Sequence, residues 1–152
     1  MSSVLDRLSA DMKSAMKERD QFTLSVIRML RSELQYAQIA AGSDKQLTEQ
    51  DVLAVLVREQ KKRRDAVKEF READRREAAE KLERELEIIA TYLPQPLSDN
   101  ELREIVQAAL EETGASSVAE MGRVMSVVMP KVQGRADGNQ VSALVKEFLS
   151  QQ

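Results

Sequence analysis

The stretch TYLPQPLS, residues 91–98, divides this chain into two parts. Its two prolines, Pro94 and Pro96, stand one residue apart. A proline cannot continue a helix, and it drives the residue before it out of the helical region. We therefore predict a short, stiff linker between an N-terminal helical domain, residues 1–93, and a C-terminal helical domain, residues 97–152.

The composition favours helices around an aliphatic core. Hydrophobic residues make up 42% of the 152 positions, but aromatic residues only 3%. No segment shows the sustained alternation of apolar and polar residues that is typical of a strand. We predict an all-α fold, in which an N-terminal long-helix hairpin or bundle is followed by a small C-terminal three-helix domain.

Apolar residues spaced three and four positions apart predict two helices at the start of the chain. The first covers about residues 3–19, and Ser3 with Asp6 forms a capping pair at its start. The second covers about residues 22–40 and is terminated by Gly42.

The segment 48–93 contains neither proline nor glycine, so that it is long enough for one helix of roughly 65 Å. Its apolar stripe thins out midway, where Asp74 and Glu77 offer a second capping box. We predict two helices, about 49–72 and 75–92, with a turn between them; a single unbroken helix is the alternative.

Three short helices are predicted beyond the linker, each opened by Ser or Asp with Glu or Gln three residues later. The starting pairs and ranges are Ser98 and Glu101 for 99–112, Ser117 and Glu120 for 118–129, and Asp137 and Gln140 for 138–150. Pro130 is expected to end the middle helix.

The chain contains no cysteine and no histidine, which excludes thiolate chemistry and the commonest neutral-pH general base. It has no phosphate-binding loop or dinucleotide fingerprint. We therefore expect no metal, no cofactor and no catalysis by this chain alone. Its first residues do not form a signal or transit peptide, and no stretch approaches the ~20 apolar residues of a membrane span. We expect a cytoplasmic protein without membrane contact.

A block of four basic residues, Lys61 to Arg64, lies within the second half of the N-terminal domain. As a functional feature it is compatible with a helix that binds nucleic acid or calmodulin. The interpretation that we favour is a solvated helix, because acidic residues three and four positions away pair with the basic ones.

The methionines Met121, Met125 and Met129 are spaced four residues apart. This spacing favours the core stripe of a helix, although methionine also suits an adaptable binding groove. Gly122 lies within the same predicted helix, where glycine costs roughly 1 kcal/mol relative to alanine. We expect a neighbouring helix or the backbone of a ligand to approach closely there.

Residues 121–136 contain three basic side chains and no acidic one, whereas the net charge of the chain is −3. The last helix presents backbone N–H groups and the positive end of its dipole at its start. Glycines in the preceding loop allow close approach of a phosphate. Against this, Asp137 as the helix cap occupies the same N–H groups. A plain turn that needs its glycines for geometry is the equal alternative.

The chain carries several short motifs that together are specific. They are Asp11-Met12-Lys13-x-Ala15-Met16-Lys17, Ile27-Arg28-Met29-Leu30, Tyr92-Leu93-Pro94-x-x-Leu97, Gly114-Ala115-Ser116, Met121-Gly122-x-Val124-Met125 and Met129-Pro130-Lys131-Val132-x-Gly134-x-Ala136-Asp137-Gly138. In these motifs, and over nearly its whole length, the chain resembles the YqeY family of small bacterial proteins. One departure is Arg135, which stands where lysine is common.

The resemblance implies that the C-terminal domain is similar to the tail domain of GatB, a component of the glutamine-dependent amidotransferase. That enzyme amidates mischarged Glu-tRNA(Gln) or Asp-tRNA(Asn), and the GatB tail contacts the tRNA body. The catalytic cradle of GatB and the glutaminase nucleophile of the enzyme are missing from this chain. The family label, carbon–nitrogen ligase with glutamine as amide donor, therefore describes the relative.

We hypothesise a non-catalytic module that binds tRNA or another structured RNA through its C-terminal domain. The candidate RNA-binding residues are Gly122, Arg123, Lys131, Gly134, Arg135 and Gly138. The alternatives are a protein-interaction adaptor that works through the N-terminal helices, and an accessory of the amidotransferase or of other translation proteins.

Overall fold

The computed structural model describes residues 3–42 and 44–151, which form seven α-helices, one 3₁₀ turn and no strand. The predicted all-α fold is thus confirmed for this part of the chain. The chain divides into two compact units, residues 1–93 (unit 1) and residues 94–152 (unit 2).

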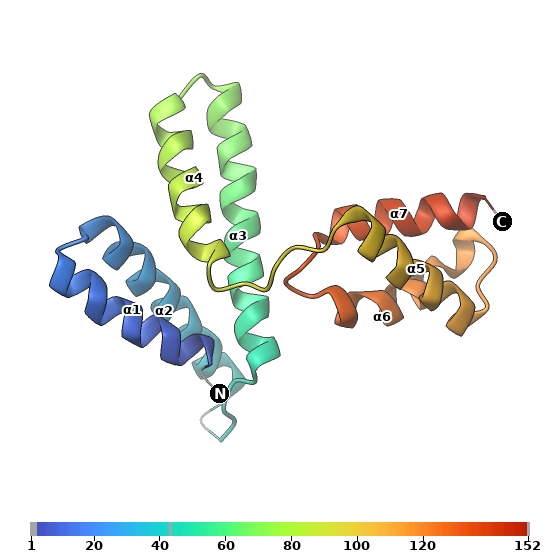
Figure 1. Cartoon of the computed structure of the whole chain (residues 1–152), viewed down its shortest axis with the longest axis horizontal. Coiled ribbons are helices and arrows are strands. Elements are labelled where there is room, and N and C mark those ends of the chain that lie inside the picture. Colours follow the sequence, from blue (N-terminus) through green and yellow to red (C-terminus); the bar gives the residue numbers. More distant parts are fainter. Residues whose placement is uncertain (1–2, 43, 152) are drawn as a thin grey trace. The chain divides into compact units, whose positions relative to one another are not determined.

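Unit 1 consists of two helical hairpins (Figure 1). Its helices are α1 (Val4–Glu18), α2 (Gln21–Ala41), α3 (Glu49–Glu72) and α4 (Arg76–Ala90). Helix α2 packs against both α3 and α4, and so joins the hairpins. Fully buried side chains of all four helices form one core, which includes Leu8, Ile27, Leu56 and Ile89.

The first two helices begin and end as predicted. Ser3 and Asp6 form a reciprocal capping box at the start of α1. Gly42 ends α2 with a φ of 98° and ψ of 152°, a region that only glycine adopts without strain.

The break between α3 and α4 is also confirmed, but the predicted capping box is wrong. Asp74 has a φ of 58° and closes α3 instead of opening α4. The Arg75 N–H bonds to the Phe70 carbonyl at 2.8 Å and the Asp74 N–H to the Arg71 carbonyl at 3.1 Å, which is the pattern of a Schellman motif. The side chain at the N-cap of α4, Arg75, makes no capping hydrogen bond.

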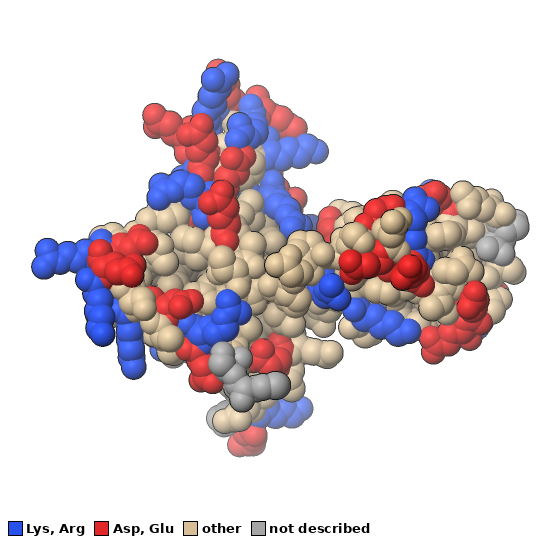
Figure 2. All heavy atoms as spheres, viewed as in Figure 1, with Lys and Arg blue, Asp and Glu red and all other residues tan. Residues whose placement is uncertain are grey.

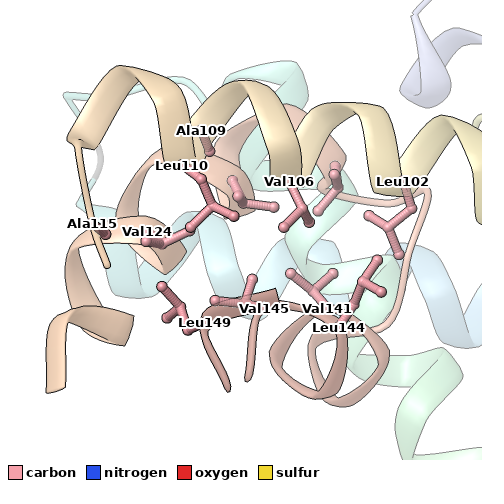
Figure 3. Close-up of a cluster of buried hydrophobic side chains, with 12 residues drawn as sticks. Leu102, Val106, Ala109, Leu110, Ala115, Val124, Val141, Leu144, Val145 and Leu149 are labelled. Carbon is pink, nitrogen blue, oxygen red and sulfur yellow. The ribbon is translucent and has the colours of Figure 1, made fainter. Parts of the chain in front are cut away.

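Unit 2 contains three helices and a 3₁₀ turn: α5 (Asp99–Thr113), η1 (Val118–Glu120), α6 (Met121–Val132) and α7 (Gly138–Ser150). Figure 3 shows how side chains of α5 and α7 point toward one another in its core. Leu102 and Val106 of α5, Val128 of α6 and Val145 of α7 are fully buried.

One predicted boundary and one predicted cap in unit 2 are wrong. Pro130 lies inside α6, which continues to Val132. A proline this near the end removes only one backbone hydrogen bond, and the extra turn buries Val132 completely. At the start of α6, Ser117 makes no capping bond. The Glu120 carboxylate instead accepts from the Ser116 N–H at 2.6 Å.

The remaining caps of unit 2 form where they are predicted. The Ser98 hydroxyl accepts from the Glu101 N–H at 3.1 Å at the start of α5. Asp137 is the N-cap of α7 and accepts from the Asn139 N–H at 3.4 Å.

The surface of unit 1 carries both signs of charge along its second hairpin. Figure 2 shows lysine and arginine side chains interspersed with acidic ones over α3 and α4. Within residues 3–42 and 44–151, no helix combines the length and the apolar character that crossing a bilayer requires.

Candidate nucleic-acid interface

The three basic residues predicted to stand unopposed in unit 2 each have an acidic neighbour, so that this expectation is wrong. Arg123 lies 3.8 Å from Glu120, Lys131 lies 3.6 Å from Glu112, and Arg135 lies 3.6 Å from Glu101. Glu101 and Glu112 belong to α5 and Glu120 to η1, all outside residues 121–136. A count along the sequence misses them because the fold supplies them from other elements.

The candidate residues do not converge on a single phosphate. Lys131 and Arg135 pair with carboxylates that are eleven residues apart on α5, which is about 16 Å along the helix axis. Any anion that contacts both cations must therefore be extended. Phosphates a few nucleotides apart on a nucleic-acid strand meet this requirement, and one inorganic phosphate does not.

Arg135 also has a structural role that sequence reasoning missed. Its guanidinium Nε donates to the Gln95 carbonyl at 2.8 Å. Its own backbone carbonyl accepts from the Leu97 N–H, also at 2.8 Å. Through these two hydrogen bonds, Arg135 connects the proline-containing linker to the loop before α7.

Gly122 lies on an open surface and not against a neighbouring helix. A Cβ atom built at Gly122 meets no atom of a neighbouring element within 4 Å among the described residues. The expected helix–helix contact is therefore absent at this position. Arg123 follows it with a side chain that is 62% exposed, although its guanidinium donates to the Thr113 carbonyl at 2.7 Å.

The methionine stripe lies beside the core of unit 2 and not at its centre. Val124, Val128 and Val132 are completely buried. Met121, Met125 and Met129 are partly buried and pack against the core cluster that includes these valines. The prediction that this is the apolar face of a helix is confirmed, with the smaller valines innermost.

The loop before α7 has the geometry that its glycine predicts. Gly134 adopts a φ of 78°, where other residues are strained. Gly138 is the first residue of α7, and a Cβ built there lies 3.8 Å from the Met129 methyl group, an ordinary contact. Because Asp137 caps α7, a phosphate at this loop must bind beside the helix end.

Sequence reasoning missed a buried charged network in unit 1. Glu59 of α3 is only 4% exposed. Its carboxylate accepts from Lys62 and Arg63, both at 3.1 Å, and Arg63 also lies 3.4 Å from Glu85 of α4. Burial raises the pKa of Glu59, but the hydrogen bonds from Lys62 and Arg63 outweigh it, and the net shift is downward. Part of the basic block is thus structural and not solvated.

A second polar contact joins the two ends of unit 1. The Tyr92 hydroxyl donates to the Asp11 carboxylate, and the Arg7 guanidinium lies 5.0 Å from the centre of the Tyr92 ring. Tyr92 is 3% exposed. Burial, followed by the bond to Asp11, raises the pKa of the Tyr92 hydroxyl well above its usual value. Asp11 and Tyr92 belong to two of the sequence motifs, and this hydrogen bond joins the two motifs in the fold.

In the described part of the chain, no three acidic side chains lie close enough together to hold a metal ion. The remaining features define a class: an all-α protein of two units, with an exposed glycine and paired, exposed cations on the second.

The family is shown by comparison with known proteins. A family model described as "Yqey-like protein" matches residues 5–149, and the chain belongs to this family. It is 35% identical over 152 residues to altered inheritance of mitochondria protein 41, mitochondrial, of Pyrenophora tritici-repentis, covering 96% of this chain and 81% of that protein. It is also 35% identical over 85 residues to uncharacterized protein C22F3.15 of Schizosaccharomyces pombe, covering 56% of this chain and 68% of that protein.

Proposed function

We propose that this protein is a non-catalytic helical module that binds structured RNA, with tRNA as the first candidate, through unit 2. The observation that carries the proposal is Gly122. Glycine weakens a helix by roughly 1 kcal/mol relative to alanine, and apart from the adjoining residues and the backbone of α6 itself, no described atom lies within 4 Å of a Cβ built there. Close approach by a ligand backbone supplies the missing reason for glycine at this position.

The ion pairs around the site are compatible with RNA binding. The side chains of Arg123, Lys131 and Arg135 are 62%, 49% and 37% exposed. Exposed pairs of this kind contribute only about 0–1 kcal/mol, so that phosphates can replace the carboxylates at little cost. Unit 2 as a whole is acidic, and we therefore expect binding that is weak and strongly dependent on salt.

The test is a titration of the full chain with purified tRNA at several salt concentrations. Each phosphate contact on a duplex lowers the logarithm of the affinity by about 0.9 per tenfold rise in salt. The double variant Lys131→Glu with Arg135→Glu is expected to lose binding and to show a flatter salt dependence. If the wild-type chain does not bind tRNA at low salt, the proposal is wrong.

A matched control separates site contacts from net charge. Lys68→Glu with Lys81→Glu changes the charge by the same amount at exposed positions on α3 and α4 of unit 1. This control is expected to retain RNA binding apart from a small general loss. Equal losses in the two double variants contradict a site in unit 2.

We place this binding role beside tRNA amidation as an accessory and not as its catalyst. The resemblance of unit 2 to the tail domain of GatB supports this placement, as does the absence of cysteine and histidine from the chain. A purified chain that amidates mischarged tRNA with glutamine, with no other protein present, contradicts it. We further place the protein in a reducing compartment, the cytoplasm; the name of the Pyrenophora relative assigns that protein to mitochondria.

A second candidate function is a protein-interaction adaptor that works through unit 1. The observation that favours it is an uneven distribution of exposed apolar side chains. Of the five large ones in the described part of the chain, four lie on α1 and α2: Leu5, Met16, Tyr36 and Ile39. A pull-down with the Lys131→Glu, Arg135→Glu variant tests this role, because an adaptor keeps its protein partner when the RNA-binding residues are reversed.

A further inference from the structure

A furrow with an apolar floor runs between α1 and α2 in unit 1. Leu5, Met12 and Met16 line it from α1, and Leu47 from the segment before α3. Leu5 and Met16 are 42% and 52% exposed, although large apolar side chains of a small domain are usually covered. The furrow therefore offers apolar area that the chain itself does not bury.

The charge beside this furrow has one sign. Arg28 and Arg31 of α2 are the charged residues that line it, and no aspartate or glutamate does. Among the residues that the structure describes, no carboxylate lies within 4 Å of either guanidinium. Arg31 lies against Met12, with 2.8 Å between its guanidinium nitrogen and the Met12 sulfur. Two available cations thus flank an apolar strip.

The shape of the furrow fits a helix. Leu5, Met12 and Met16 are seven and four residues apart, which places them in a row along α1. The row is about 16 Å long, or three helical turns. The described residues include no strand whose edge an extended peptide could join. Methionine on two of these positions adapts to different apolar side chains.

Nucleic acid fits this furrow less well than protein. No aromatic side chain lines it, so that bases have nothing to stack on. The complementary ligand needs apolar groups for the floor and acidic groups for the two arginines. An amphipathic helix with leucine or methionine on one face and glutamate or aspartate beside it provides both.

We propose that the furrow between α1 and α2 binds an acidic amphipathic helix of a partner protein. The apolar face of that helix covers Leu5 and Met16, and its carboxylates pair with Arg28 and Arg31. This inference rests on the adaptor role of unit 1 and specifies its surface and the chemistry of its partner. It is independent of RNA binding by unit 2.

The experiment is a fluorescence titration of the full chain with two labelled helical peptides of about 16 residues, long enough to form several turns. Both carry leucine along one face, and they differ only in having glutamate or lysine on the flanks. The wild-type chain is expected to bind the glutamate peptide at least about tenfold more tightly, since opposite charges attract across a partly desolvated contact.

Variants of the chain assign the effect to the furrow. Arg28→Glu with Arg31→Glu is expected to reverse the preference, so that the lysine peptide binds more tightly. Met16→Gln, at an exposed position, is expected to weaken both peptides about tenfold. Lys68→Glu with Lys81→Glu is the control of equal charge and is expected to retain the wild-type preference. Circular dichroism of each variant checks that its helices are intact.

Equal binding of the two peptides overturns the proposal, and so does wild-type binding by both furrow variants. Two further outcomes also overturn it: a dimer of the chain that Met16→Gln abolishes, and sedimentation of the chain with anionic vesicles that Met16→Gln abolishes. The dimer identifies a second copy as the occupant, and the vesicles a membrane surface. A protein partner that stays bound in the pull-down while the peptides fail overturns only the furrow and leaves the adaptor role. If neither the protein partner nor the peptides bind, both the furrow proposal and the adaptor role are wrong.

Discussion

The charged network of unit 1 and the ion pairs of unit 2 use the same residue types in opposite surroundings. Glu59 is 4% exposed and the Arg63 side chain 11%. In unit 2, the Lys131 and Glu112 side chains are 49% and 61% exposed. A pair removed from water is costly to break, whereas an exposed pair contributes little and is easily exchanged. The first therefore serves stability, and the second remains available for a ligand.

The largest expected effect comes from breaking the buried network. Glu59→Ala removes the partner of Arg63 and Lys62, and we expect it to lower the free energy of unfolding by about 2–3 kcal/mol, in line with hydrogen bonds to charged groups. Glu83→Ala is the matched control, because Glu83 pairs with Arg71 on the same hairpin but is 42% exposed. Denaturant unfolding measures both. Similar losses for Glu59→Ala and Glu83→Ala contradict the comparison.

The same network has a defined pH dependence. The pKa of Glu59 in the folded chain lies below its ordinary 4.5, so that the charged form stabilises the fold above pH 4.5. This stabilisation is lost as the pH falls through the lowered pKa. We expect Glu59→Gln to be less stable than wild type at about pH 6 and closer to it at about pH 3.5. A stability gap that does not narrow on acidification indicates that Glu59 is not the titrating group.

A smaller loss is expected at the contact between the ends of unit 1. Tyr92→Phe removes one hydrogen bond to Asp11 and keeps the buried ring, and we expect a loss of about 1 kcal/mol in thermal or denaturant unfolding. Tyr36→Phe is the control, because Tyr36 is 67% exposed and its change is expected to be near zero. An unchanged stability for Tyr92→Phe shows that the bond to Asp11 makes no net contribution.

A change in the opposite direction is expected in unit 2. Gly122→Ala meets open space and a helical backbone, so that we expect a gain of up to about 1 kcal/mol in stability. Gly42→Ala is expected to destabilise, because its φ of 98° strains any residue with a Cβ. If RNA approaches the backbone at Gly122, the alanine variant is more stable but binds tRNA less tightly.

The smallest effect is expected for the exposed pairs themselves. Lys131→Ala removes the contact with Glu112, and we expect a change of less than about 0.5 kcal/mol in the free energy of unfolding. Its effect on tRNA affinity is expected to be larger than its effect on stability. A loss of stability comparable to that of Glu59→Ala shows that Lys131 is part of the structure and not of a binding surface.

Local signals in the sequence predicted most of the fold. The apolar spacing, the glycine at position 42 and the capping pair of Ser3 and Asp6 decide where the first helices begin and end, and these interactions span only a few residues. The error at Asp74 is a local one, because backbone hydrogen bonds within a few residues close α3 there. The error at Pro130 is decided by tertiary packing. At Pro130 the burial of Val132 outweighs the cost of proline in a helix.

The candidate site was predicted less well, because its electrostatics depend on residues distant in sequence. Glu101 becomes a neighbour of Arg135, and Glu112 a neighbour of Lys131, only when α5 packs beside α6 and α7. For the same reason, Arg63 in a basic block gave no sign of its contact with Glu85 of the next helix. Gly122 differs from these residues, because the sequence alone marked it as unusual: a glycine inside a predicted helix. The structure shows no contact with a neighbouring element that requires a glycine there.

The central claim, that RNA binds the Gly122–Arg123 surface and the loop before α7, is tested most directly by mapping backbone amide NMR shifts of the full chain during titration with tRNA. We expect shifts and line broadening to concentrate in residues 121–138 and to leave the furrow between α1 and α2 unchanged. Changes confined to unit 1, or none at low salt, contradict it.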